Sequence, residues 1–551
     1  MGHLPEGTDP QSGYRSSDRI YYSKRPPVRI PQASGLDVTS FLLAPQFGDK
    51  KAIVDAPTGR CLTFSQLERD VRMLAAGLYR DLGVRQYDVV MLLSSNCIEF
   101  LVVFLAVLSL GAVVTTMNPV NTAAEIRKQM QDSGTKFIFT TATLLEKVAG
   151  TDKPVVVFGN DDVVPGSRSN ATHRFSELLR ADLNDLPRVH VTQDSTAALL
   201  YSSGTTGTSK GVTITHRNII SATCMISSLL LPDQILLLVL PMFHIFGLVF
   251  GTFCPIFMGM TMIVLPRYDL VKMLTAIQTY RATYLPLVPP IVVSLAKQDL
   301  VLKYDLSSLK HTYCAAAPLG KETVDACVER FPNVKFQQGY GLTESTCSGT
   351  TSPSDDIVDM AAHFGSAGTL NPNMEAMVVD PATNQPMPPT KQGELWIRGP
   401  SCIMKGYHNN PKATSETVDK DGWLHTGDLV LIDRDGYLFV LDRLKELIKY
   451  NTNQVTPAEL EALLLSHPAV LDCAVIPYPD ERAGQIPMAY IVRVPGHEYF
   501  NEGEVMRWVK KQVAPYKKVR KVSFINAIPK SAAGKILRRE LVQLATTKSR
   551  L

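Results

Sequence analysis

The sequence predicts an α/β fold with a large N-terminal domain and a small α+β C-terminal domain. The chain has 551 residues, more than one hydrophobic core usually serves, so at least two domains are expected. Between residues 51 and 440, short β-branched runs alternate with amphipathic stretches, a pattern typical of buried sheets covered by helices. After residue 442 the patterns become short and mixed. We therefore predict domains at residues 1–441 and 442–551.

The strands predicted in the first domain are continuous apolar runs, as expected where both faces of a sheet are covered. Examples are residues 89–93 (VVMLL), 155–158 (VVVF) and 262–265 (MIVL). From residue 393 the pattern changes to alternation, with strands at 394–398 and, after the turn at Asp435-Gly436, at 437–440.

The C-terminal domain is predicted to follow a dense charge run at 442–446 (DRLKE). A helix is expected to begin near Thr456, because Thr456, Pro457 and Glu459 follow the order of N-cap, first-turn proline and capping box. Strands are predicted at 470–475 and 488–492.

The composition is that of an ordinary globular protein, with 45% hydrophobic and 20% charged residues. A net charge of +4 on so long a chain gives no reason to expect a nucleic-acid partner, although it suits anionic small ligands. The nine cysteines are scattered singly, without a pair or a Cys/His cluster at zinc spacing, so reduced thiols in an intracellular protein are expected. The polar N-terminus lacks the apolar core of a signal peptide.

One uncharged stretch, residues 100–117, is long enough to be considered as a membrane span. A helix buried in the α/β core and followed by a buried strand is the interpretation we prefer. Gly111 would interrupt a spanning helix, and the β-branched run at 113–116 (VVTT) favours a strand. No membrane span is therefore predicted.

The chain ends in Ser549-Arg550-Leu551, which differs from the Ser-Lys-Leu peroxisomal address only by Arg in place of Lys. A three-residue match also arises by chance, but here it follows a basic tail. We therefore predict the peroxisomal import receptor as a partner and the peroxisome as the location, with the cytoplasm as the alternative.

The most informative segment for chemistry is residues 201–212 (YSSGTTGTSKGV). Apolar runs at 197–200 and 212–214 flank it, so it is predicted to be a loop between two strands. Glycines let the backbone N–H groups approach an anion, and the hydroxyls and Lys210 add donors, which suits phosphate. A flexible Ser/Gly linker is the alternative. The segment is not a P-loop, because Ser209 stands where that motif has Gly.

This loop resembles the phosphate loop of the acyl-adenylate-forming superfamily, which includes acyl- and aryl-CoA ligases, peptide-synthetase adenylation domains and beetle luciferase. Further motifs of that superfamily follow in order: QGYGLTE at 338–344, GELWIRG at 393–399, GWLHTGD at 422–428, DRLKE at 442–446 and PKSAAGK at 529–535. The resemblance covers nearly the whole chain. Within the superfamily the sequence is most similar to plant 4-coumarate–CoA ligase-like proteins of the peroxisomal branch.

The resemblance implies an ATP-dependent acid–CoA ligase that forms an acyl-adenylate and then a thioester, using ATP, Mg²⁺ and coenzyme A on a small carboxylic acid. It also implies an N-terminal domain of stacked α/β sheets with a distorted β-barrel, and a mobile C-terminal domain that turns about a hinge at Asp442-Arg443. Joining a carboxylate to a phosphate brings two anions together, so the site must supply positive charge and donors.

By the same resemblance, most of the expected site residues bind nucleotide. Glu344 would hold Mg²⁺, since hard carboxylate oxygens suit that ion. Asp428 would accept bonds from the ribose hydroxyls. The nucleotide-binding residues implied by the motifs are Ser202, Ser203, Gly204, Thr205, Thr206, Lys210, Gln338, Gly339, Thr343, Asp428, Arg443 and Lys445.

Four catalytic residues are implied. Lys535 would neutralise the charge that develops at the reacting phosphate and carboxylate, and His244 would lie beside the carboxylate. Lys449 and Gln454 would enter the active site for the thioester-forming step, after rotation of the C-terminal domain. From residue type alone, Lys535 would be a solvated lysine in a basic tail and His244 a satisfied core histidine.

The predicted acid pocket departs from 4-coumarate ligases. Phe246 and Phe250 stand where those enzymes have a tyrosine and a serine, and Cys314-Ala315 replaces Ser-Gly before Ala316. A pocket without polar partners penalises a buried phenol hydroxyl. We therefore expect cinnamate or a related aromatic acid with an apolar far end, or else a medium- or long-chain fatty acid or a jasmonate precursor. Neutral drift is the other interpretation.

A second departure lies after the hinge. Asn451-Thr452 replaces the Lys-Gly of the family at the place where the coenzyme A arm passes, while Arg267 matches a basic coenzyme A contact. The alternative function is therefore an adenylate-binding protein impaired in thioester formation. A luciferase-like oxidation of the adenylate is a further alternative that no residue specifically favours.

Overall fold

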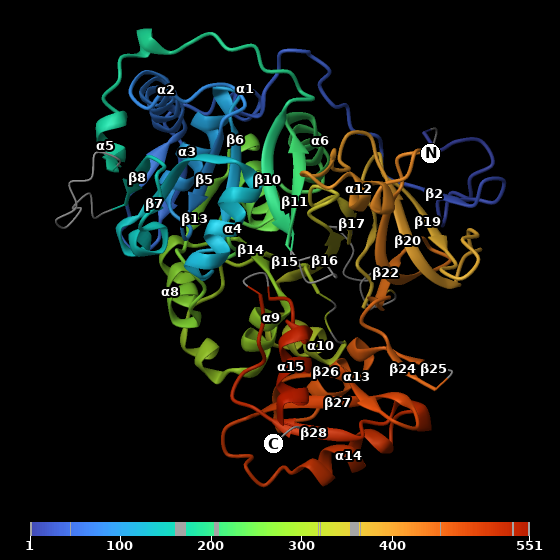
Figure 1. The fold of residues 1–551 in the computed structure, drawn as a ribbon. Helices are drawn as coiled ribbons and strands as arrows, with labels where there is room; N and C mark the ends of the chain where they lie inside the picture. The colour runs from blue at the N-terminus through green and yellow to red at the C-terminus, as the bar shows by residue number, and fades with distance from the viewer. Residues whose placement is uncertain are drawn as a thin grey trace.

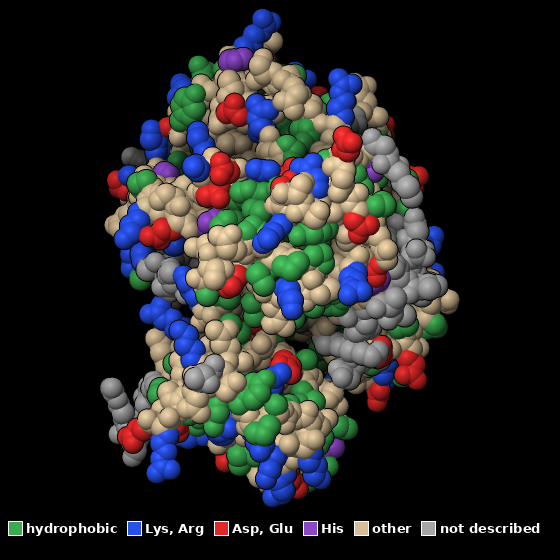
Figure 2. Space-filling model, turned by 90° about the vertical axis from the view of Figure 1, so that its right-hand side faces the viewer, with side chains coloured by type: hydrophobic (Ala, Val, Ile, Leu, Met, Phe, Trp, Pro, Cys, Tyr) green, Lys and Arg blue, Asp and Glu red, His purple; other side chains and the backbone are tan. Residues whose placement is uncertain are grey.

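The computed structural model describes all residues except 1–2, 45, 160–171, 203–208, 318, 320, 353–362, 364, 452, 532–533 and 549–551. The predicted import signal, Ser549-Arg550-Leu551, lies outside the described residues. Figure 1 shows a large body above and a small C-terminal body below. Figure 2, turned by 90° about the vertical axis, shows a narrowing between the two bodies. Charged side chains of both signs are interspersed over the face in view.

The first of two large sheets has eight strands, and its central strands run parallel. Its edge is antiparallel where β10 meets β11 and β11 meets β21. In spatial order the strands are β21 (Gly406–Tyr407), β11 (Lys210–Thr215), β10 (Thr196–Ser202), β6 (Val113–Met117), β5 (Val89–Leu93), β7 (Thr135–Thr141), β8 (Val155–Phe158) and β9 (Thr172–Arg174).

The second large sheet has nine strands, of which six neighbouring ones run parallel. Their carboxyl ends meet at one edge, which is where α/β sheets usually bind ligands. In spatial order the strands are β18 (Thr369–Leu370), β17 (Gly349–Thr351), β16 (Lys335–Gly341), β15 (His311–Cys314), β14 (Tyr284–Leu287), β12 (Ile235–Leu238), β13 (Thr261–Val264), β3 (Lys51–Asp55) and β4 (Cys61–Thr63).

The two large sheets share one hydrophobic core. Helix α3 (Ile98–Ser109) contacts β5 and β6 of one sheet and β3 of the other, and its residues 98–108 are all buried. The uncharged stretch is thus a core helix followed by strand β6, as predicted, with Gly111 at φ +66° between them. Within the described residues, no helix has the length and apolarity needed to cross a bilayer.

Other helices cover these sheets or join their strands. They are α1 (Val38–Leu43), α2 (Phe64–Arg80), α4 (Ala123–Ser133), α5 (Phe175–Leu178), α6 (His216–Ser227), α7 (Cys254–Phe257), α8 (Leu270–Tyr280), α9 (Pro289–Lys297), α10 (Lys321–Arg330) and α12 (Pro411–Thr417).

A six-stranded antiparallel sheet with its own core stands where the distorted barrel was expected. Its alternating burial fits a sheet with one covered face. The predicted turn lies between its last two strands, with Gly436 at φ +80°. The strands are β1 (Tyr14–Arg15), β2 (Ile20–Tyr22), β19 (Glu375–Val379), β20 (Gln392–Arg398), β22 (Leu424–Ile432) and β23 (Leu438–Arg443).

The C-terminal body has a five-stranded sheet and two hydrophobic clusters of its own. The chain leaves the six-stranded sheet at Arg443, the last residue of β23, so the change of sheet falls beside the expected hinge. The elements are β24 (Ile448–Tyr450), β25 (Asn453–Val455), α13 (Pro457–Leu465), β26 (Val470–Asp480), β27 (Gly484–Arg493), α14 (Glu502–Lys510), β28 (Lys521–Phe524) and α15 (Arg538–Lys548).

Helix α13 begins at Pro457 as predicted, but the expected capping box is absent, because the Thr456 side chain makes no capping bond. Asp442 supplies the cap instead. Its Oδ2 accepts a 3.0 Å hydrogen bond from the backbone N–H of Ala458 in the first turn of the helix. The sequence pattern missed this cap because the acceptor lies 16 residues away, at the expected hinge.

Candidate active site

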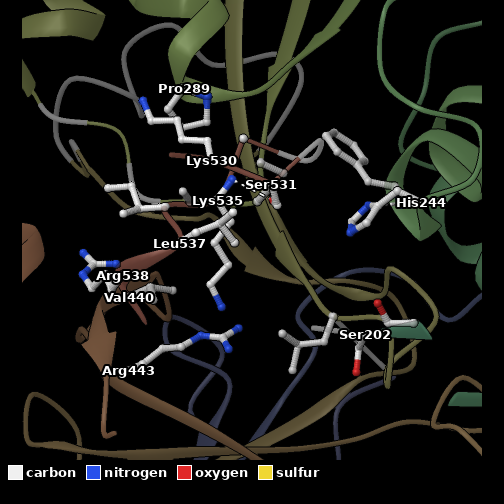
Figure 3. A pocket seen from close by; sticks show the side chains of 18 of the residues that line it. Ser202, His244, Pro289, Val440, Arg443, Lys530, Ser531, Lys535, Leu537 and Arg538 are labelled. Atoms are coloured by element: carbon white, nitrogen blue, oxygen red, sulfur yellow. Dashed lines mark hydrogen bonds between the residues drawn. The ribbon is translucent and has the colours of Figure 1, made fainter. Parts of the chain in front are cut away.

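A cavity of about 1480 Å³ lies where the large sheets, the six-stranded sheet and the C-terminal body meet. The motifs found in sequence are far apart along the chain, yet their residues converge on its walls. Of the predicted site residues, the cavity is lined by Ser202, Lys210, His244, Phe246, Ala315, Ala316, Gln338, Gly339, Thr343, Glu344, Asp428, Arg443, Lys445 and Lys535. Figure 3 shows Lys535 and Arg443 on one side, with Ser202 and His244 across from them.

The predicted phosphate loop is clamped at its base. Ser202 ends β10, Lys210 begins β11, and the two residues are paired across the antiparallel ladder. The strands therefore hold both ends of the loop together, as expected for a loop between two strands. Four predicted residues of the loop, Ser203, Gly204, Thr205 and Thr206, lie outside the described residues.

Glu344 is held by two hydroxyl groups. Its Oε1 accepts hydrogen bonds from Ser202 Oγ at 3.0 Å and from the Tyr407 hydroxyl at 2.9 Å. Burial raises the pKa of Tyr407, and the neighbouring Glu344 carboxylate adds to that effect, so the phenol stays protonated and donates. The ring of Tyr407 also lies under Lys210, whose Nζ is 4.7 Å from the ring centroid.

Sequence reasoning missed Tyr407. Its only signal was the Lys405-Gly406-Tyr407 run, which alone predicts nothing. The residue reaches the site because β21, a strand of two residues, pairs with β11 next to the phosphate loop.

Asp428 is a buried carboxylate with two partners. Its Oδ2 accepts a 2.6 Å hydrogen bond from the Tyr340 hydroxyl, and its Oδ1 lies 3.2 Å from Arg443 Nε. Asp428 and Arg443 are paired across β22 and β23, so the sheet register fixes their contact. Burial raises the pKa of Asp428, while the Arg443 charge and the Tyr340 hydrogen bond oppose that rise. Tyr340 was not predicted as a site residue.

Lys535 extends into the cavity toward Arg443 (Figure 3). Its loop is closed by a bridge between Lys530 and Ile536, and Lys535 N–H donates a 3.2 Å hydrogen bond to Ser531 Oγ. Burial, followed by repulsion from Arg443, lowers the pKa of Lys535 to about 8, against the attraction of Glu446, whose Oε1 is 4.0 Å away.

Arg538 anchors the Lys535 loop to helix α13 and the hinge. It pairs with Glu461 at 2.7 Å and with Glu446 at 2.8 Å. Burial raises the pKa of Glu461 to about 7, and Arg538 opposes that rise. In sequence Arg538 was only part of a basic tail, because its two carboxylate partners lie 77 and 92 residues away.

At the other end of the cavity, His244 lies just before a helix with π-type hydrogen bonding, residues Phe246–Phe253. Helices of this type are frequent at functional sites. The Phe246 N–H donates to His244 Nδ1 at 3.4 Å. Burial lowers the pKa of His244 to about 4, so the imidazole is neutral at physiological pH.

The predicted acid pocket is aromatic. Phe246 lines the cavity together with Tyr313, which sequence reasoning missed, and their ring centroids are 5.8 Å apart. Phe250, the other aromatic residue predicted for this pocket, is absent from the cavity lining and stacks on Tyr313, with ring centroids 4.3 Å apart. It lies about one turn after Phe246 on the π-type helix.

Two small residues keep this region open. Ala315 follows β15 and lines the cavity, and Ala316 takes φ +80°, a conformation that residues with a Cβ rarely adopt. A Cβ on Gly339 would fall 1.7 Å from the Tyr313 hydroxyl, so the close approach of these two residues requires glycine.

Several predicted residues do not meet the cavity. Lys449 and Gln454 are exposed and face each other across the β24–β25 hairpin, and neither lines the cavity. Asn451 is at the tip of that hairpin with φ +50°, and Thr452 lies outside the described residues. Arg267 is exposed after β13, also away from the cavity lining.

Two family models match parts of this chain. Residues 43–408 match the family described as AMP-binding enzyme, and residues 459–535 match the AMP-binding enzyme C-terminal domain. The chain is 49% identical to a probable CoA ligase, CCL5, of Humulus lupulus over 98% of both chains. It is 46% identical to peroxisomal OPC-8:0-CoA ligase 1 of Arabidopsis thaliana, over 98% of this chain and 99% of that one. The fold is similar to ATP-bound MatB from Rhodopseudomonas palustris, with a TM-score of 0.81 and 26% identity over 92% of this chain and 98% of that one.

Proposed function

We propose that this chain, which belongs to the AMP-binding enzyme family and is an AMP-forming acid–thiol ligase, converts an apolar carboxylic acid to its coenzyme A thioester through an acyl-adenylate. One observation carries the proposal. Lys535, Asp428 and Glu344, from three distant motifs, line the same cavity as His244 and the aromatic pocket.

In the first step, a carboxylate oxygen attacks the α-phosphorus of ATP, and pyrophosphate leaves. Two anions approach each other, so the site must offset their repulsion with fixed positive charge. Lys535 and Arg443 supply it on one wall, and Lys210 supplies it beside the phosphate loop. Neutral His244 brings a hydrogen-bonding ring to the carboxylate end without adding another anion.

Asp428 is suited to bind ribose. It is buried beside Arg443, whose charge favours the ionised form, and a carboxylate accepts hydrogen bonds from two vicinal hydroxyls. Gly339, which lines the cavity and packs closely on Tyr313, is proposed to lie on the adenine side. Thr343 and Gln338 line the same wall and complete the proposed nucleotide contacts.

A magnesium ion fits at Glu344. The donor is a hard carboxylate oxygen, and both of the hydroxyl bonds described above end on Oε1 rather than on Oε2. When bound, the ion would reduce the charge of the pyrophosphate leaving group. Ser202 and Tyr407 hold the carboxylate in place for this role.

The second step needs the thiol of coenzyme A to attack the acyl carbonyl, which releases AMP. Lys449 and Gln454, proposed for this step, lie on an exposed hairpin outside the cavity, whereas Lys535 lies inside it. This separation supports an arrangement suited to the first step. Rotation of residues 442–551 about Asp442-Arg443 is proposed to withdraw Lys535 from the cavity and to bring Lys449 and Gln454 into it.

We propose an acid with an apolar far end, such as cinnamate. Phe246 and Ala315 line the cavity without a hydroxyl, and the hydroxyl of the neighbouring Tyr313 is already hydrogen-bonded with Thr351 at 3.3 Å, which supports this choice. A longer jasmonate-precursor acid is a second candidate, favoured by the 46% identity to a relative named as an OPC-8:0-CoA ligase. That relative's name and Ser549-Arg550-Leu551 also support a proposed peroxisomal location.

The test is a panel of cinnamates, benzoates and fatty acids with ATP, Mg²⁺ and coenzyme A. Pyrophosphate and thioester are scored separately. Acid-dependent formation of both supports a ligase. Pyrophosphate without thioester supports the rival, an adenylate-forming protein impaired at Asn451-Thr452. Absence of acid-dependent pyrophosphate with every acid would overturn the proposal.

A further inference from the structure

Helix α9 (Pro289–Lys297) of the large body contacts the C-terminal body at both of its ends. At its C-terminal end, Lys297 Nζ donates two hydrogen bonds, to the carbonyl oxygens of Leu465 at 2.9 Å and Val470 at 3.0 Å. Leu465 is the last residue of α13, and Val470 is the first residue of β26. One side chain thus joins two elements of the C-terminal body to the large body.

The chemistry of this contact is specific. The last carbonyls of a helix lack partners within the helix and carry partial negative charge, so a lysine is a favoured partner. The Lys297 side chain is part-buried. Burial lowers its pKa, whereas electrostatic interaction with Cys473 and Asp472 raises it. If Lys297 were replaced by an apolar side chain of similar length, both bonds would be lost while the stem still packed.

At its N-terminal end, α9 supports the loop that carries Lys535. Gly534 takes φ +78°, and a Cβ at this position would lie 3.1 Å from Val288 Cγ2 and 3.4 Å from Pro290 Cδ. The loop therefore rests closely on the first turn of α9. The same short helix touches the Lys535 loop at one end and α13 and β26 at the other.

We propose that Lys297 is a positioning residue for acyl-adenylate formation, because its two bonds hold the C-terminal body in the orientation that keeps Lys535 in the cavity. The proposal rests on the proposed function, since it assigns Lys535 to that step. Lys297 itself is absent from the cavity lining, so it is assigned no contact with the substrates. The bonds between bodies must break for the C-terminal body to turn, so their loss favours departure from this orientation.

The test compares Lys297→Met with Lys297→Arg, which retains donors, and with Lys303→Met as a matched control. Lys303 is an exposed lysine on the same segment, six residues further on. Acid-dependent pyrophosphate release and conversion of a supplied acyl-adenylate to thioester are measured separately. Lys297→Met should lower pyrophosphate release about tenfold or more, since two charge-assisted bonds are lost, and should leave the thioester step unchanged or faster. Lys297→Arg should restore most of the loss.

An equal effect on both steps, or none on either, would overturn the proposal. Hydrogen exchange gives a readout that needs no activity. Lys297→Met should accelerate exchange of the amides of residues 534–537, and Lys303→Met should not. If the unchanged chain releases no acid-dependent pyrophosphate, the proposed function fails, and exchange alone then decides whether Lys297 holds the Lys535 loop: faster exchange supports it, and unchanged exchange overturns it.

Discussion

The hydroxyl of Tyr407 donates a 2.9 Å hydrogen bond to Oε1 of Glu344, the residue proposed to hold Mg²⁺. The same tyrosine ring lies under Lys210 at the base of the phosphate loop. One side chain from a two-residue strand therefore orients both a proposed metal ligand and a proposed phosphate-binding lysine.

Removing only the hydroxyl separates these two roles. Tyr407→Phe keeps the ring under Lys210 but removes one of the two hydroxyl groups that hold Glu344, leaving only Ser202. The Mg²⁺ concentration for half-maximal pyrophosphate release should therefore rise about tenfold, as is typical when a partner of a metal ligand is removed. Calorimetric titration of Mg²⁺ into the ATP-loaded protein checks the same change without turnover. The control is Tyr87→Phe, at a tyrosine that is 65% exposed. An unchanged Mg²⁺ requirement would show that Tyr407 does not orient Glu344.

The pKa of Lys535 predicts a pH dependence for adenylation. This pKa is lowered to about 8, and the ammonium form is the one that offsets phosphate charge. Above about pH 8, kcat/KM for pyrophosphate release should therefore fall as the amine loses its proton. Conversion of a supplied acyl-adenylate to thioester should not follow this profile.

Lys535→Ala should abolish acid-dependent pyrophosphate release yet still convert a supplied acyl-adenylate. Lys535→Arg should move the alkaline decline to higher pH, because guanidinium stays protonated there. If the alanine variant loses both steps equally, the account of two orientations is wrong for this protein.

The acid pocket predicts a preference among acids that differ by one hydroxyl. Phe246 lines the cavity without a hydroxyl, and the hydroxyl of the neighbouring Tyr313 is already hydrogen-bonded with Thr351 at 3.3 Å. A 4-hydroxyl group there would therefore lose water without gaining a matching partner, at a cost of about 1–3 kcal/mol. Cinnamate should therefore exceed 4-coumarate in kcat/KM about tenfold or more. Phe246→Tyr should narrow that ratio.

Phe250→Leu is the control for this ratio, because Phe250 lies behind Tyr313 and outside the cavity lining. It should change the rates with both acids by similar factors. Equal or better use of 4-coumarate by the unchanged chain would contradict the proposed apolar pocket.

The hairpin tip predicts weak use of coenzyme A. Asn451 lacks the charge of the family's lysine, so Asn451→Lys with Thr452→Gly should lower the KM for coenzyme A, by about fivefold from the charge alone, and should leave pyrophosphate release unchanged. Because Asn451 has φ +50°, the lysine itself costs about 1 kcal/mol of backbone strain, so Asn451→Gly with Thr452→Gly is the control without charge. A KM that no variant changes would mean that coenzyme A passes elsewhere.

Much of the fold and site could be predicted from the sequence, because the information is local. Gly111 and the following β-branched run separate a core helix from a strand, and the apolar runs around residues 201–212 place the phosphate loop between β10 and β11. The order of the sequence motifs then predicted several of the residues that line the cavity, such as Asp428 and Lys535.

The residues that were missed act through partners distant in sequence. Tyr340 meets Asp428 across 88 residues, and Lys297 meets Leu465 across 168. Phe250 stacks on Tyr313, which is 63 residues away and was not predicted as a site residue, and a spacing in sequence does not predict such a contact.

The most direct test of the central claim follows an oxygen atom. The preferred acid is labelled with ¹⁸O at both carboxylate oxygens and incubated with the protein, ATP, Mg²⁺ and coenzyme A. The masses of the products are then measured by mass spectrometry. Attack of the carboxylate on the α-phosphorus leaves its oxygen on that phosphorus when the thiol displaces AMP. An acyl-adenylate intermediate should give AMP carrying one ¹⁸O and an equal amount of acyl-CoA. Unlabelled AMP, or ADP as the product, would contradict an acyl-adenylate.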